Sequence, residues 1–351
     1  SEGVGDHCAI SAGDVWVSPS GNDDENLGTS EEQAFLTVER AIEMIAPEDD
    51  SQITIHLTEG TFSPSITGEN FPIIMIPNVN LDGEEEDRSI IDAEGTDRVI
   101  NIVDCYNNII SNLSITGGFL SNGSLWGGGG GIHILGSNPT LTHLTISGNT
   151  IDGVYAVGGG IYLLNSHPHM TDLTIIDNYA AAGAGIHYQE SDGFLSNSTI
   201  SNNKANISYA GEGGGIHFSG SKPIVTNVVI SNNEAEWAAG GIKLSGSSPT
   251  LINVAVVNNT AINNGGGMVF YFSDAILRNV TVANNNSNGV SEVTGTGAVF
   301  SNSIIWNNSL NPSDINISGS YNYIAGNSDN ENEYPFNAND YALSDGSPCI
   351  N

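Results

Sequence analysis

The sequence predicts an all-β chain that forms a single-stranded right-handed parallel β-helix with a short N-terminal capping helix. Three observations predict this fold: a glycine-rich motif that recurs every 25 to 30 residues, an alternating apolar strand after each copy, and an Asn at the end of each strand. A unit of this length with no helical segment is too long for a hairpin and fits one turn of a solenoid. The right-handed sense follows from the general rule for connections between parallel strands.

The repeat is plainest in the second half of the chain. Its glycine clusters run into a column of residues that we expect to face outward: His133, Tyr162, His187, His217 and Lys243. Each cluster is followed by a turn and a strand, and the strands end at Asn149, Asn178, Asn203, Asn233, Asn259, Asn285 and Asn308. Asn tolerates the left-handed backbone conformation, and its amide can bond a like amide one turn above. We therefore expect a stacked ladder of asparagine amides beside a continuous apolar core.

The N-terminal residues 1–52 are predicted to cap the solenoid. Residues 31–45 are expected to form a helix, with Thr29 or Ser30 as its N-cap. One face of this stretch is apolar: Phe35, Val38, Ala41, Ile42 and Ile45. Such a helix would cover strand edges and apolar surface at the open end. Irregular first turns over residues 53–120, regular repeat turns over 121–310 and a closing segment over 311–351 complete the predicted organisation.

The charge of the chain restricts its partners. Asp and Glu number 40 against 7 Lys and Arg, which gives a formal net charge of −33. Such a surface repels phosphate, so we expect no nucleic acid partner, and anionic lipid is disfavoured for the same reason. The longest apolar runs fall short of the 18 or so residues that a membrane span needs. An anionic glycan would need bridging divalent cations, and salt or calcium would screen the self-repulsion of the protein.

Several motifs resemble known extracellular families. The opening Val15-Trp16-Val17-Ser18-Pro19-Ser20-Gly21-Asn22-Asp23 resembles that of secreted pectate-lyase-like β-helix proteins. The Gly-Gly-Gly-Ile and Ile-x-x-Asn pairs resemble polymorphic outer membrane protein repeats, and the ending 340–351 is similar to the end of choice-of-anchor β-helix proteins. These resemblances imply a secreted or cell-surface protein, anchored through a further C-terminal segment. They imply no single activity, because the families mix enzymes with adhesins.

The chain starts at Ser1 without a signal peptide, so we expect a mature or trimmed secreted form. Its three cysteines, Cys8, Cys105 and Cys349, lie far apart and allow at most one disulfide, with no metal-type spacing.

The loops between each Asn and the next glycine cluster hold the candidate binding residues. Five of them carry one aromatic residue each: Trp126, Tyr155, Tyr179, Tyr209 and Trp237. Carboxylates accompany these rings: Asp152, Asp177, Glu212, Glu234 and Glu236. Equivalent loops of a solenoid lie on one side of the rod, so we call this predicted strip of aromatics and acids the loop ridge. Aromatic faces beside polar acceptors suit sugar rings or a protein partner, while packing of each ring over its own loop is the alternative.

Two catalytic hypotheses remain open beside simple binding. Asp177 and Glu212 are the candidate carboxylate pair of a glycoside hydrolase, which needs two carboxylates flanking the bond. His217 and Lys243 are the candidate bases of a calcium-assisted polysaccharide lyase. The histidines of the outward column could alternatively bind a transition metal, or the column could be a solvated polar stripe.

Calcium is the one cofactor that the acidic composition would admit, and the binding hypothesis requires none. Asp23, Asp24 and Glu25 form one acidic loop, and residues 82–87 form another, although neither matches a known calcium loop. Solvated charge is the alternative for both.

The sequence therefore favours a secreted or cell-surface β-helix repeat protein. It would bind glycan, a partner protein or its own copies through the loop ridge, without catalysis. An extracellular polysaccharide-degrading hydrolase or lyase is the alternative, and self-assembly by end-to-end stacking is a third possibility.

Overall fold

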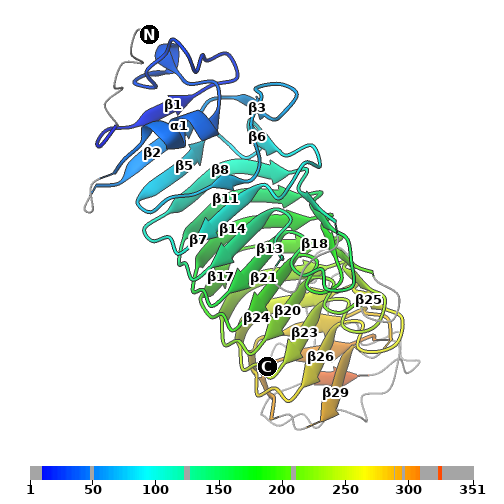
Figure 1. Cartoon of the computed structure of the whole chain (residues 1–351). Coiled ribbons are helices and arrows are strands. Elements are labelled where there is room, and N and C mark those ends of the chain that lie inside the picture. The colour runs from blue at the N-terminus through cyan, green and yellow to red at the C-terminus, as the bar shows by residue number, and fades with distance from the viewer. Residues whose placement is uncertain are drawn as a thin grey trace, which may run out of the picture.

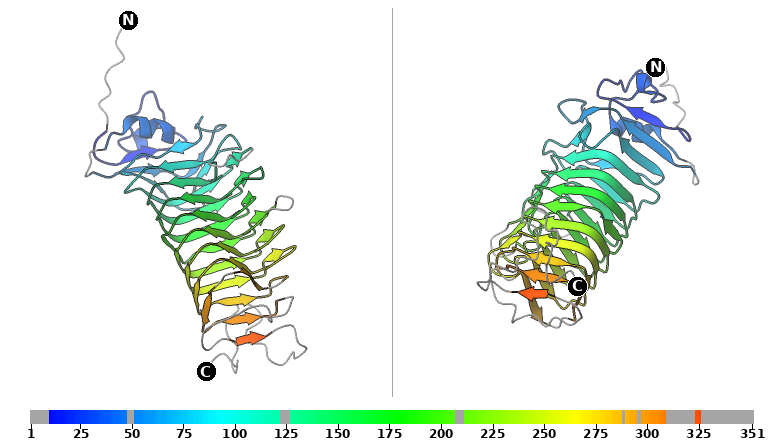
Figure 2. Two further views of the ribbon diagram at one scale, coloured as in Figure 1. Left: turned by 60° about the horizontal axis from the view of Figure 1, so that its bottom comes forward. Right: turned by 180° about the vertical axis from the view of Figure 1, so that it is seen from behind.

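A computed structural model describes residues 10–47, 51–121, 127–206, 211–287, 289–294, 297–308 and 323–325. These residues form one rod of parallel strands that stack turn upon turn from the N-terminal end (Figure 1). Two further views show the same regular stacking along the rod (Figure 2). The prediction of an all-β parallel β-helix with almost no helix is confirmed.

Three parallel sheets make up the wall of the rod. The broad sheet comprises β1 (Val15–Val17), β2 (Ile53–Leu57), β3 (Gly60–Phe62), β5 (Val79–Gly83), β6 (Ser89–Asp92), β8 (Ile109–Thr116), β11 (Thr140–Ser147), β14 (His169–Ile176), β17 (Phe194–Ser196), β18 (Thr199–Ser201), β21 (Ile224–Ser231), β24 (Thr250–Val257), β27 (Ile276–Arg278), β28 (Thr281–Ala283), β30 (Val299–Ser301), β31 (Ile304–Trp306) and β32 (Tyr323–Ala325). A nine-stranded sheet comprises β4 (Ile73–Ile74), β7 (Ile100–Val103), β10 (Ile132–Leu135), β13 (Ile161–Leu164), β16 (Ile186–Gln189), β20 (Ile216–Ser219), β23 (Ile242–Ser245), β26 (Met268–Tyr271) and β29 (Val290–Thr294). A six-stranded sheet comprises β9 (Phe119–Leu120), β12 (Thr150–Ile151), β15 (Tyr179–Ala180), β19 (Lys204–Ala205), β22 (Glu234–Ala235) and β25 (Thr260–Ala261).

The core is a continuous stack of like residues. In β11 and β14, for example, Leu144 pairs with Leu173 and Ile146 pairs with Ile175 in register. These side chains are buried in one cluster that runs from Val15 to Ile305. Because the side-chain period of a strand is two, the in-register pairing keeps every apolar column on the inside.

The asparagine ladder forms as expected at the corner that follows the broad sheet. The Oδ1 atom of Asn203 accepts hydrogen bonds from the backbone N and the Nδ2 of Asn178, each at 3.0 Å. Its own Nδ2 donates to Asn233 Oδ1 at 3.0 Å and to the Ile175 carbonyl at 2.9 Å. The same pattern links all the predicted members from Asn149 to Asn308. Every polar atom of these buried amides is thereby satisfied, as burial requires.

A second ladder stands at the corner between the nine-stranded sheet and the broad sheet. Here the serine of each turn accepts a hydrogen bond from the backbone N–H of the serine one turn earlier, at 3.0 to 3.2 Å. Its members are buried: Ser137, Ser166, Ser191, Ser221, Ser247 and Ser273. The sequence analysis predicted a turn at these positions but no ladder of serine side chains.

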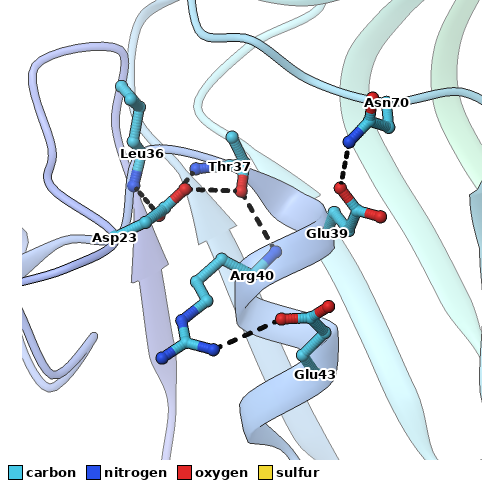
Figure 3. A network of polar contacts seen from close by, with 7 residues as sticks. All are labelled: Asp23, Leu36, Thr37, Glu39, Arg40, Glu43 and Asn70. Carbon is cyan, nitrogen blue, oxygen red and sulfur yellow. Dashed lines mark hydrogen bonds and ion pairs between the residues drawn. The ribbon is translucent and has the colours of Figure 1, made fainter.

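The predicted helix 31–45 is wrong in its extent. A single 3₁₀ turn, η1, spans Glu31–Gln33, and the α-helix α1 begins only at Val38 and ends at Met44. Between them Phe35 is extended, because its N–H donates to Trp16 and a bridge pairs it with Val17 beside β1. The N-cap is Thr37, whose side chain accepts from Arg40 N at 3.1 Å, and not Thr29 or Ser30 (Figure 3).

The helix is tied to the solenoid by a buried carboxylate. Glu69, which is 1% exposed, accepts hydrogen bonds from the N–H groups of Val38 at 2.7 Å and Glu39 at 2.9 Å. Burial raises the pKa of Glu69 to about 7, against the lowering effect of these two N–H donors. The N-terminal end of the short helix is therefore fixed to the loop that carries Glu69.

Some predictions fall on residues outside this description. Cys8, Cys349 and nearly all of the closing segment 311–351 lie there. Cys105 is buried and free. No helix within the described ranges is long and apolar enough to cross a membrane.

Candidate functional site

The loop ridge lies along the outer side of the six-stranded sheet. Two of its residues share one outward column with Lys204 in consecutive strands, since Tyr179 pairs with Lys204 and Lys204 pairs with Glu234. The Lys204 ammonium lies 3.1 Å from the Glu234 carboxylate. Both groups are well exposed, so this ion pair orients the side chains more than it stabilises the fold.

Tyr179 is the packed member of the ridge. Its hydroxyl donates a short hydrogen bond to the Asn206 carbonyl of the next turn. Partial burial raises the pKa of Tyr179, Asp152 and Glu236 raise it further, and Lys204 opposes them. Four polar or charged groups from three other turns therefore act on this ring: Asp152, Lys204, Asn206 and Glu236. Its half-buried position agrees with the packing alternative.

Tyr155 and Trp237 are the solvent-exposed aromatic residues of the ridge. Their exposed fractions are 59% and 41%, which is high for large rings. Beside Trp237, one carboxylate oxygen of the half-buried Glu236 is shielded from solvent and has no hydrogen-bond partner among the described residues. Trp126 and Tyr209, the other two predicted ring residues, lie outside the described residues. The ridge thus offers two open aromatic faces with carboxylates nearby.

The column next to the ridge is in register but not solvated. His133, Tyr162, His187, His217 and Lys243 pair strand by strand along the nine-stranded sheet, and all are buried. The expectation of a solvated outward stripe is therefore wrong. The glycine clusters fold back over the column: a Cβ on Gly183, which has a φ of 55°, would lie 2.8 Å from the Cβ of His187. We call these five residues the histidine column.

The imidazoles of this column are held neutral by burial. Burial lowers the pKa of His133 and of His187 to about 4. Burial also lowers the pKa of His217 well below its ordinary value, and the neighbouring His187 and Lys243 lower it as well. His217 Nε2 contacts Ser245 Oγ at 3.1 Å, and its ring lies 4.7 Å from that of His187. Among the described residues, the Nδ1 atoms of His187 and His217 have no hydrogen-bond partner.

The structure brings three of the four proposed catalytic residues to neighbouring turns. Lys243 Nζ lies 3.3 Å from Glu212 Oε1 and 6.0 Å from the centre of the Tyr271 ring, and His217 precedes Lys243 in the column. Asp177 lies apart from them. Asp177 is exposed and has a left-handed backbone, with a φ of 57°, at the corner just before β15. Glu212 lies further along its turn, past the strands of the six-stranded sheet, and forms β-bridges with Ala182 and Ala238.

The acidic loop proposed for calcium serves the helix cap. The Asp23 carboxylate accepts from Leu36 N at 2.6 Å, Thr37 N at 3.2 Å and the Thr37 hydroxyl at 2.8 Å (Figure 3). The next two residues, Asp24 and Glu25, are exposed. Within the described ranges no group of three or more His, Cys, Asp or Glu side chains is placed to hold a metal ion. The calcium site stays a prediction.

Comparison with solved structures agrees with this architecture. Pectate lyase Pel9A superposes with a TM-score of 0.58 at 13% identity, covering 90% of this chain and 80% of that one. Pectin methylesterase PemA from Erwinia chrysanthemi gives a TM-score of 0.45 at 11% identity, covering 89% and 93%. At these identities the likeness concerns the fold alone. No curated protein matches the chain in sequence.

A family profile matches most of the repeat region. The profile described as the right handed beta helix region matches residues 93–248 and 160–329, which together span more than half of the chain. The chain therefore belongs to the right-handed β-helix family.

Proposed function

We propose that this protein is a secreted or cell-surface β-helix that binds a glycan chain through the loop ridge, without catalysis. The observation that carries the proposal is the exposure of Tyr155 and Trp237 on one side of the rod. A soluble protein leaves such large rings open mainly where they meet a partner, and sugar rings stack on aromatic faces. A partner protein or a second copy of the chain is the other occupant that such rings suit.

The spacing of the ridge suits an extended polymer. Tyr155 follows β12 and Trp237 follows β22, and two strands of the six-stranded sheet lie between them. At the usual spacing of about 4.8 Å between strands, three turns separate the two rings by roughly 14 Å along the rod. A glycan chain lying parallel to the axis would therefore contact both rings and pass Tyr179, Lys204 and Glu234 between them.

The polar groups between the rings would orient the chain. Lys204 and Glu234 are held by their ion pair and offer a donor and an acceptor to sugar hydroxyls. The fold shared with a pectate lyase supports a carbohydrate-related role, since that protein's name places it among enzymes that act on a polysaccharide. The fold by itself does not separate binding from catalysis.

The test is a binding measurement on single-ring variants. We expect Trp237→Ala and Tyr155→Ala each to weaken binding in a glycan array and in calorimetry by about tenfold, because each removes one stacking face. Tyr106→Ala is the matched control, since Tyr106 is 51% exposed but lies on another part of the rod. Equal losses in all three variants, or a wild-type protein that binds no glycan, would contradict the proposal.

A polysaccharide lyase is the second candidate, and the contact of Lys243 with Glu212 beside His217 is the observation that favours it. If it is correct, wild-type protein supplied with calcium will release unsaturated products from a uronate polymer, and Lys243→Ala will not. Release of reducing ends without unsaturation, lost in Glu212→Gln, would indicate a hydrolase instead. No turnover of any polymer, with binding retained, leaves the first proposal standing.

A further inference from the structure

A pocket of about 190 Å³ opens on the N-terminal turns, far along the chain from the loop ridge. Its wall is an outward column of the broad sheet, in which Trp16 of β1 pairs with His56 of β2, and His56 pairs with Asp82 of β5. These three strands lie side by side near the N-terminal end in Figure 1. Glu31, Thr58 and Glu84 complete the polar lining.

The imidazole of His56 is fixed between two carboxylates. Its Nε2 lies 3.5 Å from Asp14 Oδ2, and its Nδ1 lies 3.6 Å from Asp82 Oδ2. The ring centre lies 5.1 Å from that of Trp16. Asp82 is itself held by the Ser111 hydroxyl at 2.6 Å and the Asn112 amide at 2.9 Å. The indole and the imidazole therefore present a preorganised pair of rings.

The lining holds three carboxylates, those of Glu31, Asp82 and Glu84, and no Lys or Arg of the described ranges lines the pocket. Arg88 pairs with Glu84 at 2.8 Å, and His56 is placed between Asp14 and Asp82. Glu31 has no ion-pair partner among the described residues, and it is exposed. A phosphate or uronate would meet carboxylates here, whereas a cation would meet Glu31 and the face of Trp16.

One further lining group lacks a partner. The Thr58 hydroxyl is buried and makes no hydrogen bond within the described part of the chain. A buried polar atom without a partner is costly, so such an atom at a pocket is a natural contact for a ligand hydroxyl or amine.

We propose that this pocket binds one sugar-sized ring bearing a protonated amine, that is, an amino sugar. The ammonium would lie between Glu31 and the indole of Trp16, and a ring hydroxyl would reach Thr58. The inference is independent of the loop ridge, because the two sites share no residue.

The experiment compares two adjacent glutamates. Methyl glucosamine is titrated into the full chain, with methyl N-acetylglucosamine as the uncharged probe and calcium as a metal probe. We expect methyl glucosamine to bind at least tenfold tighter than the acetylated sugar, Glu31→Gln to weaken it about fivefold, and Trp16→Ala to abolish it. Glu32→Gln, which removes the same charge from the same 3₁₀ turn but does not line the pocket, should leave binding unchanged.

Several results would overturn the proposal. Equal binding of the acetylated sugar would mean a neutral sugar pocket, and equal loss in Glu32→Gln would mean attraction by the net charge alone. A response to calcium without one to the amine would mean a metal site. Circular dichroism of Trp16→Ala separates loss of binding from loss of folding, and Trp16→Phe, which keeps an aromatic face, should retain part of the affinity. Trp237→Ala should bind methyl glucosamine normally, so failure of the ridge proposal leaves this one testable.

Discussion

Two buried polar columns run through the same turns of this rod, and they differ in how well they are satisfied. In the asparagine ladder each Nδ2 and Oδ1 finds partners one turn away. In the histidine column the Nδ1 atoms of His187 and His217 have no hydrogen-bond partner in the part of the chain that the structure describes. The difference teaches that stacking identical amides satisfies both donor and acceptor at every step, whereas a mixed column of rings and an ammonium cannot repeat one pattern. We expect the ladder to hold the fold and the column to set its response to pH.

The largest expected effect is the loss of stability when the asparagine ladder is interrupted. Asn233→Leu would remove the acceptor of Asn203 N and one hydrogen bond each from Asn203 Nδ2, the Ile200 carbonyl and Asn259 Oδ1. Asn203 Nδ2 would keep the Ile175 and Ser201 carbonyls, and Asn259 Oδ1 would keep the backbone N–H of residue 233. The loss of several buried hydrogen bonds should lower the free energy of unfolding by about 4 kcal/mol, as measured by urea denaturation.

The control for that variant is the exposed corner residue Asn227, which also stacks on a like amide, Asn197. Asn227→Gly keeps the left-handed backbone and should cost under about 1 kcal/mol, because water replaces the lost bond. A loss of similar size in both variants would break the distinction between buried and exposed ladders.

The next effect is a pH dependence that comes from the histidine column. His187 has a pKa of about 4 in the folded chain, below its ordinary value of about 6.5. Between these values the unfolded chain takes up a proton and the folded chain does not, so stability is complete above pH 6.5 and is lost as the pH falls toward 4. His187→Phe should flatten the slope of unfolding free energy against pH by up to about 1.4 kcal/mol per unit.

A matched variant sharpens this result. His169→Phe replaces an exposed histidine that stacks on Phe194, outside the covered column. An equal change of slope in both variants would show that net charge, and not burial of the imidazole, controls the acid response.

The smallest of these effects concerns the serine ladder. Ser221→Ala would leave the buried Ser191 N–H without its acceptor, now at 3.0 Å. We expect a loss of about 2 kcal/mol in unfolding free energy. Ser231→Ala, which changes a half-buried serine at the end of β21, should lower the free energy of unfolding by less. No difference between them would mean that water can replace the serine hydroxyl at the corner.

The sequence predicted the periodic parts of the molecule because identical spacing places identical residues in contact. The asparagine ladder, the apolar columns and the vertical order of the histidine column all follow from that rule. The prediction of an α-helix was wrong for residues 31–37, because Phe35 pairs with β1. The helical spacing of the apolar residues does not reveal this tertiary contact. The pocket at His56 escaped notice because Asp14, His56 and Asp82 belong to irregular turns with no common spacing.

The candidate site divides in the same way. That Tyr179, Lys204 and Glu234 would form one column could be predicted from the repeat. The repeat could not predict that Tyr179 is packed while Trp237 is exposed, because that difference depends on the shape of each loop. The burial of His217 and Lys243 likewise depends on glycine loops that fold back over them.

The sequence by itself determined the solenoid, its core and its ladder, because a short repeat with in-register strands leaves one way to bury its apolar side. Only the tertiary structure decided which outward residues meet solvent, where Glu69 anchors the helix, and that Trp16 and His56 share a pocket. Those outcomes depend on loops and turns whose lengths differ, and a pattern of spacing carries no information about how unequal segments pack.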